Sequence, residues 1–133
     1  MKKYEEVFTI DEVGEDTGEK FVGKFTCKTR LSHAERLTQD SLRRNMLGIQ
    51  PQGATPGERA ANTAEILSNL AVRLVESPSW WTNSNNGQDL FDDNILISVF
   101  TKAVDCEMRA KAKVKEAAGE AKKELAKEAE DNA

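Results

Sequence analysis

The sequence is poor in the residues from which catalytic and metal sites are usually built. Its 133 residues include one histidine, His33, and two cysteines, Cys27 and Cys106, that lie far apart in the chain. His33 falls at the start of a predicted helix, where an exposed side chain is expected. The cysteines match neither the spacing of a zinc site nor a disulfide framework. We therefore expect no catalytic residue, no metal and no cofactor, and a protein that is not an enzyme.

Long apolar runs and basic blocks are also missing. No stretch approaches the roughly 20 apolar residues that span a bilayer, and the first residues lack the apolar core of a secretory signal. The net charge of −4 comes from residues 1–20, which hold three lysines and seven acids, and the rest of the chain is balanced. Without a basic region, binding to nucleic acid through phosphate neutralisation is not expected. These absences favour a cytoplasmic protein with reduced thiols and no membrane partner.

Alternating side chains predict a β-hairpin over residues 5–30, with a turn at residues 14–18. The alternation places Phe8, Ile10, Phe21 and Phe25 on one face, which we expect to pack on helices because a lone hairpin is only marginally stable. Cys27 falls on the same face of the second strand and reads as a small buried side chain. The opposite, solvent-facing side is expected to carry Val22, Lys24, Thr26 and Lys28. Gly23 marks a bulge or the close approach of another backbone.

Capping signals and apolar spacing predict three helices. Ser32 and Glu35 form a capping box at the start of the first, and Thr55 with Pro56 begins the second in the same way. Asp89 or Asp92 caps the third. The apolar positions are Leu37, Leu42, Met46 and Leu47 in the first helix; Ala60, Ala64, Leu67, Leu70, Ala71, Leu74 and Val75 in the second; and Ile95, Leu96, Val99, Phe100, Ala103 and Val104 in the third. We prefer helix capping to a calcium site for the acids before the third helix.

Two adjacent tryptophans, Trp80 and Trp81, interrupt the polar segment between the second and third helices. Neighbouring residues of an extended segment point in opposite directions. We therefore expect one tryptophan to fill the core and the other to face solvent or a partner, since tryptophan is a favoured binding residue.

Residues 109–133 form a charged tail rich in alanine, lysine and glutamate, which are strong helix formers. Val114 and Leu125 are its large apolar residues, and with the tryptophans they are the candidate partner-binding residues. We expect residues 1–108 to form one domain of hairpin and helices. The tail should continue the third helix, fray toward Ala133, and gain order on binding a partner.

The strings Phe21-Val22-Gly23-Lys24-Phe25, Lys28-Thr29-Arg30-Leu31-Ser32-His33, Glu76-Ser77-Pro78-Ser79-Trp80-Trp81 and Gly87-Gln88-Asp89-Leu90 carry a resemblance. With the order hairpin, capped helix, helix, Trp-Trp segment, helix, the chain resembles the tail assembly chaperones of long-tailed bacteriophages over residues 5–108. The resemblance implies a non-enzymatic protein of the host cell cytoplasm that binds the helical tape measure protein before the tail tube forms around it. It brings no cofactor and no catalytic residue.

The sequence therefore predicts an α+β fold, mostly helical, in which an N-terminal β-hairpin packs on a three-helix core and a charged helix extends beyond it. The leading function is a phage tail assembly chaperone that keeps the tape measure protein soluble. The alternative is a small structural protein of the phage head or tail, with another phage structural protein as its partner. A homo-oligomer is compatible with either function. A small enzyme would need a pocket with convergent polar groups, which the sequence does not indicate.

Overall fold

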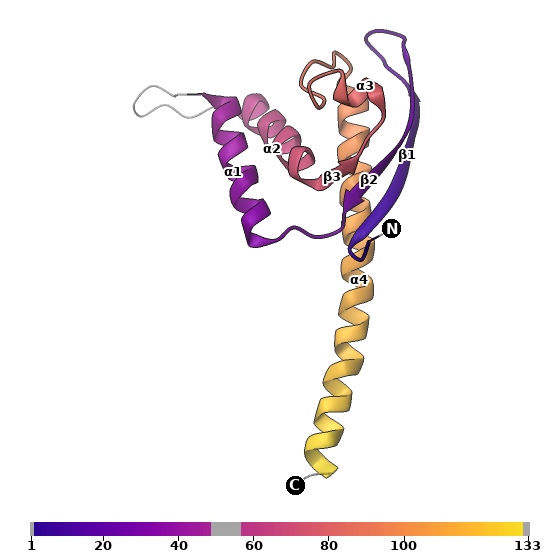
Figure 1. Ribbon diagram of the computed structural model, residues 1–133, viewed down its shortest axis with the longest axis vertical. Coiled ribbons are helices and arrows are strands. Elements are labelled where there is room, and N and C mark those ends of the chain that lie inside the picture. The colour runs from indigo at the N-terminus through magenta and orange to yellow at the C-terminus, as the bar shows by residue number, and fades with distance from the viewer. Residues whose placement is uncertain (1, 49–56, 132–133) are drawn as a thin grey trace.

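The computed structural model describes residues 2–48 and 57–131 as a small sheet beside four helices (Figure 1). Along the chain these elements are β1 (Glu5–Val13), β2 (Lys20–Lys28), α1 (His33–Leu47), α2 (Glu58–Arg73), β3 (Leu74–Glu76), α3 (Ser79–Thr82) and α4 (Asp93–Asp131). The architecture is α+β and mostly helical, which confirms the predicted fold class.

The predicted hairpin forms the greater part of the sheet. Strands β1 and β2 pair antiparallel with Phe8 opposite Phe25, and these two rings stack with centroids 4.9 Å apart. Ile10 and Phe21 are buried with them, which confirms the predicted apolar face. The prediction that Thr26 faces solvent is wrong. Thr26 is buried because a third strand, β3, pairs antiparallel with β2 at this position.

Strand β3 replaces the last turn that we predicted for the second helix. Helix α2 ends at Arg73, and Leu74 and Val75 are extended rather than helical. Leucine and valine are compatible with either state, so the local pattern did not distinguish them. The free edge of β2 decides the conformation, because its backbone groups need hydrogen-bond partners.

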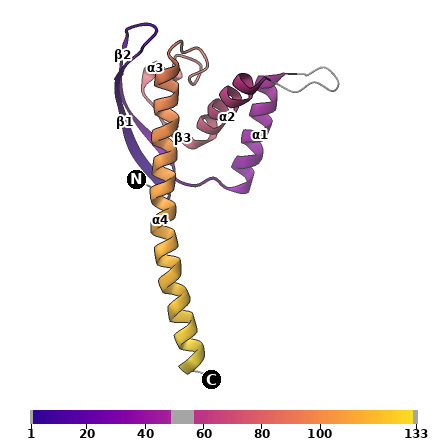
Figure 2. The same cartoon turned by 180° about the vertical axis from the view of Figure 1, so that it is seen from behind.

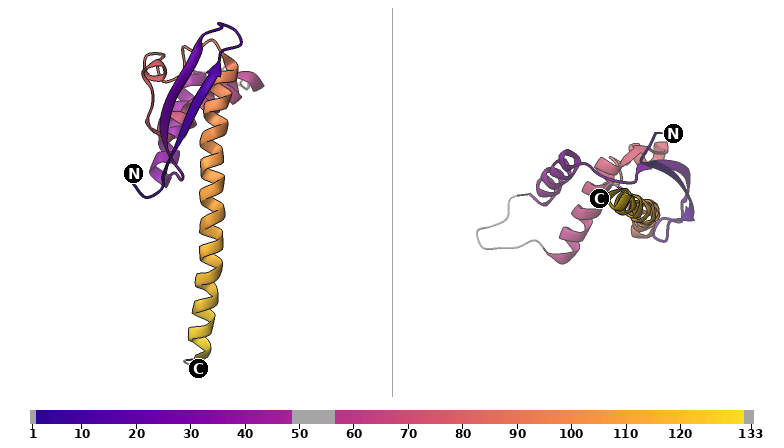
Figure 3. Two further views of the ribbon diagram at one scale, coloured as in Figure 1. Left: turned by 90° about the vertical axis from the view of Figure 1, so that its right-hand side faces the viewer. Right: turned by 90° about the horizontal axis from the view of Figure 1, so that it is seen from below.

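Helices α1 and α2 form a pair that stands beside the sheet (Figure 3). The capping box at Ser32 and Glu35 is present, as predicted, but α1 contributes no buried residue to the core. Leu37, which we expected on its apolar side, is 72% exposed. Helix α2 begins with Gly57 as its N-cap and has no side-chain cap. The predicted start at Thr55 and Pro56 lies outside the described residues.

Helix α4 is long and changes character along its length. Its first four turns pack on β1 and β2 through Ile95, Val99, Ala103 and Cys106, which are buried. Residues 111–131 are all exposed, and the helix projects from the body without a break, so the predicted continuity of the tail is confirmed (Figures 1 and 2). Among the described residues, no helix has both the length and the apolar character that a membrane span requires.

Candidate partner-binding site

An aromatic cluster lies between the sheet and the α3 segment. Trp81 is one of its fully buried members and meets Phe25 edge to face, with ring centroids 5.7 Å apart. Gly87, at φ +89°, lies against the Trp81 indole so closely that a Cβ there would come within 2.5 Å of the ring. The prediction that one of the two tryptophans fills the core is confirmed for Trp81.

Trp80 packs against the start of β2 and is not fully exposed to solvent. It is half-buried, its ring meets Phe21 edge to face at 5.0 Å, and its Nε1–H donates a 3.0 Å hydrogen bond to the Val22 carbonyl. The two tryptophans do not point in opposite directions because Ser79–Thr82 is a helical turn, not an extended segment. Binding of a partner by either tryptophan stays a prediction.

The predicted close approach at Gly23 is present, although a side chain makes it rather than a backbone. A Cβ on Gly23 would lie 2.6 Å from the Pro78 ring carbons and 3.2 Å from Trp80 Nε1. The absence of a side chain at this position therefore lets the Pro78–Trp80 segment cross the face of β2.

Asp92, one of the acidic residues just before α4, holds the hairpin turn. The Asp92 carboxylate accepts hydrogen bonds from the Asp16 amide at 2.7 Å, the Thr17 amide at 3.0 Å and the Thr17 hydroxyl at 2.7 Å. Burial alone would raise the pKa of Asp92, but these hydrogen bonds outweigh it and lower the pKa. The expected cap therefore binds the turn with its side chain, while its backbone carbonyl accepts from the Leu96 amide of the first helical turn.

The two cysteines, distant in sequence, meet between β2 and α4. Both are buried and free, and their thiols lie close enough to influence each other's pKa. Burial and the neighbouring Cys106 raise the pKa of Cys27 to about 12, and burial raises the pKa of Cys106 as well. The nucleophilic form of a cysteine is the thiolate, so these thiols are inert near neutral pH. The prediction that Cys27 packs as a small buried side chain is confirmed.

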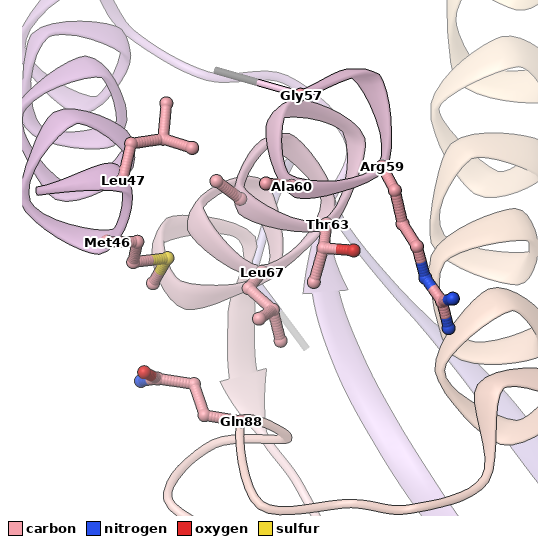
Figure 4. Close-up of a pocket in the computed structure, with 9 residues that line it drawn as sticks. Met46, Leu47, Gly57, Arg59, Ala60, Thr63, Leu67 and Gln88 are labelled. Atoms are coloured by element: carbon pink, nitrogen blue, oxygen red, sulfur yellow. The ribbon is translucent and has the colours of Figure 1, made fainter. Parts of the chain in front are cut away.

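A pocket of about 770 Å³ lies between α1, α2 and the segment after α3. Figure 4 shows Met46 and Leu47 of α1 on one side, Ala60 and Leu67 of α2 on another, and Gln88 below them. Among the described residues that line it, Arg59 is the only one with a charge, and its side chain points away toward α4. The lining suits apolar side chains better than a small substrate, which needs several convergent polar groups.

A second groove, of about 480 Å³, lies on the other side of α2, between its first two turns and the start of α4. We call it the α2–α4 groove. Its apolar residues are Ile66, Leu96 and Ile97, and Ile97 is 54% exposed. Its rim is charged: Arg59 and Asp93 form an exposed ion pair across it, with Nη2 and Oδ2 3.4 Å apart.

The two predicted tail residues lie on the projecting part of α4, whereas the two tryptophans lie on α3. Val114 is 43% exposed and Leu125 is 65% exposed. The structure therefore does not bring the four candidate partner-binding residues together. The α2–α4 groove was missed because its two walls come from segments some thirty residues apart. Ile97 gives a weak sequence signal, being an apolar residue off the buried face of its helix.

Among the described residues, His33 belongs to no group that could bind a metal ion. His33 is exposed at the start of α1. Within residues 2–48 and 57–131, no three histidine, cysteine, aspartate or glutamate side chains gather in a way that would hold a metal ion. Comparison of the chain with protein-family models, curated proteins and solved structures finds no match.

Proposed function

We propose that this chain is a non-enzymatic phage tail assembly chaperone, which binds the helical tape measure protein in the host cell cytoplasm and keeps it soluble until the tail tube forms. The observation that carries the proposal is the α2–α4 groove, an exposed apolar furrow with a charged rim. The order of elements supports it too, since a hairpin, a capped helix, a second helix, a Trp-Trp segment and a long helix follow one another as in the family that the sequence resembles.

The groove suits an amphipathic helix. Ile66, Leu96 and Ile97 would contact the apolar stripe of such a helix, while Glu58, Arg59 and Asp93 on the rim would face its flanking charges. The ion pair between Arg59 and Asp93 is highly exposed, so opening it to admit a partner costs little. A tape measure protein offers many amphipathic helical turns, and covering them would prevent their aggregation.

A second candidate function is a permanent structural protein of the phage head or tail. The observation in its favour is the projecting part of α4, because a fully exposed helix of this length suits an element that is packed in an assembled particle. Mass spectrometry of purified particles separates the two functions. A structural protein is present at a fixed copy number, whereas a chaperone is absent.

The proposed function is tested by expressing the tape measure protein of the same phage with and without this chain. We expect the chain to raise the soluble fraction of the tape measure protein and to co-purify with it. Ile97→Glu should abolish both effects. Val22→Glu is the matched control, because Val22 is 62% exposed on the outer face of the sheet, close to the 54% of Ile97.

Two negative results have different meanings. If the unmodified chain neither dissolves nor binds the tape measure protein, the proposed function is wrong. If it does both but Ile97→Glu behaves like Val22→Glu, the function stands and the α2–α4 groove is not the binding site.

A further inference from the structure

The projecting part of α4 packs on no other helix or strand that the structure describes. Residues 111–131 are exposed on every side, and at 1.5 Å per residue they extend about 30 Å beyond the body (Figure 3). Helices in proteins owe most of their stability to the burial of an apolar face. This segment has such a face, and none of residues 2–48 and 57–131 covers it.

The apolar face has the spacing of a helix–helix seam. Val114, Ala118, Ala121 and Leu125 follow one another at intervals of four, three and four residues, which is the a/d pattern of a coiled coil. The two large residues stand at the ends of this stripe and the two alanines at its centre. Small central side chains allow two helix axes to approach to the short end of the usual range, about 8 Å.

Charge is strongly segregated along the same segment. Residues 109–115 hold one arginine, three lysines and no acid, a net charge of +4, while residues 116–131 hold six acids and three lysines, a net charge of −3. A parallel pair of such helices would place like charges side by side. An antiparallel pair places the basic segment of each copy along the acidic segment of the other, within the screening length of about 8 Å at physiological salt.

We infer that the projecting part of α4 pairs antiparallel with the same segment of a second copy of this chain. One register satisfies the apolar stripe, and it has its two-fold axis between Gly119 and Glu120. There Val114 faces Leu125 of the partner subunit and Ala118 faces the partner's Ala121. Lys111 is three residues before Val114, at the next a/d position of the seam. In this register it lies level with the partner subunit's Glu128.

The length of the exposed helix fits this register. Asp131 of each copy reaches the level of Met108 in the partner subunit, just where the body of that subunit begins. The exposed helix is therefore used over its whole described length, and the two bodies stand at opposite ends of the pair. Met108, which is also exposed, gains cover from the end of the partner helix. This inference rests on the chain itself and does not depend on the proposed function.

Sedimentation equilibrium of the full chain tests the pairing. We expect a reversible monomer–dimer equilibrium that weakens between about 0.05 M and about 0.5 M NaCl as the charges are screened. Leu125→Glu should weaken the dimer at least about tenfold, because it removes a buried leucine from both ends of the seam. Ala126→Glu is the control: it adds the same charge to the neighbouring residue, which points away from the seam, and should leave the dimer intact.

The direction of pairing is tested by exchanging charges. Lys111→Glu and Glu128→Lys should each weaken the dimer, and the double variant should restore it, because an antiparallel pair then has the opposite charges in exchanged places. Circular dichroism of each variant checks that the body stays folded, and all the positions are exposed. A chain that is monomeric at every concentration, a dimer that survives Leu125→Glu, or a double variant that fails to restore pairing would each overturn the inference.

Discussion

Replacement of Trp81 by alanine is expected to remove a large part of the stability of the domain. A tryptophan buries about 150–250 Å². At about 25 cal/mol per Å² this corresponds to about 4–6 kcal/mol, in line with the roughly 3–5 kcal/mol measured for removal of large aromatic side chains from protein cores. Trp81 is fully buried against Phe25 and Gly87, so the estimate applies to it without reduction.

The assay is urea unfolding followed by circular dichroism at 222 nm. A loss of about 4 kcal/mol lowers the midpoint by about 2–3 M urea, if unfolding has the usual dependence on denaturant for a domain of this size. Because domains have only about 5–15 kcal/mol of stability, Trp81→Phe is measured in parallel as a milder variant that stays folded, and it should fall between Trp81→Ala and the unmodified chain.

Trp80→Phe provides the comparison from the same aromatic cluster. It keeps an aromatic ring against Phe21 and loses the hydrogen bond to the Val22 carbonyl, so the expected cost is about 1 kcal/mol. If Trp81→Ala costs less than about 1 kcal/mol, or no more than Trp80→Phe, then Trp81 is not the centre of the core.

Other positions give further tests. Gly119→Ala should raise the helix content measured at 222 nm and favour the α4 helix by about 1 kcal/mol, because Gly119 has no atom within 4 Å of the new Cβ; a loss of helix would show that the glycine is needed for a bend. Cys27 and Cys106 should resist iodoacetamide in the native protein and react rapidly in urea, as counted by mass spectrometry; fast labelling of the native chain would contradict their burial. The hydrogen bonds to the Asp92 carboxylate lower its pKa from the ordinary 3.8, so its stabilising effect is complete above that value and is lost as the pH falls through the lower folded-state pKa. The melting temperature of Asp92→Asn should therefore be below that of the unmodified chain at pH 6 and approach it in acid. A constant difference between pH 6 and pH 2 would show that the carboxylate does not hold the turn at Thr17 through its charge.

The features that the sequence predicted correctly depend on neighbouring residues. The capping box needs Ser32 and Glu35, three residues apart, and both of its hydrogen bonds form. The hairpin face needs side chains that alternate along each strand, and Phe8 and Phe25 stack as this alternation requires.

The features that sequence reasoning missed depend on contacts between distant segments. Strand β3 forms because Leu74 reaches Cys27 on the free edge of β2. The Asp92 side chain binds the turn at Thr17, more than seventy residues earlier, rather than the first turn of its own helix. The α2–α4 groove has the same origin, since Ile66 and Ile97 line one groove only once the fold brings α2 and the start of α4 together.

Amide hydrogen exchange of the chain, alone and mixed with the tape measure protein, locates the surface that the proposed chaperone uses. We expect slower exchange in the complex at the start of α2, over residues 58–66, and at the start of α4, over residues 93–97, because these segments form the walls of the α2–α4 groove. Exchange on the outer face of the sheet around Val22 should not change. Protection of the sheet with no change in the two helix starts would show that the tape measure protein does not bind in the α2–α4 groove.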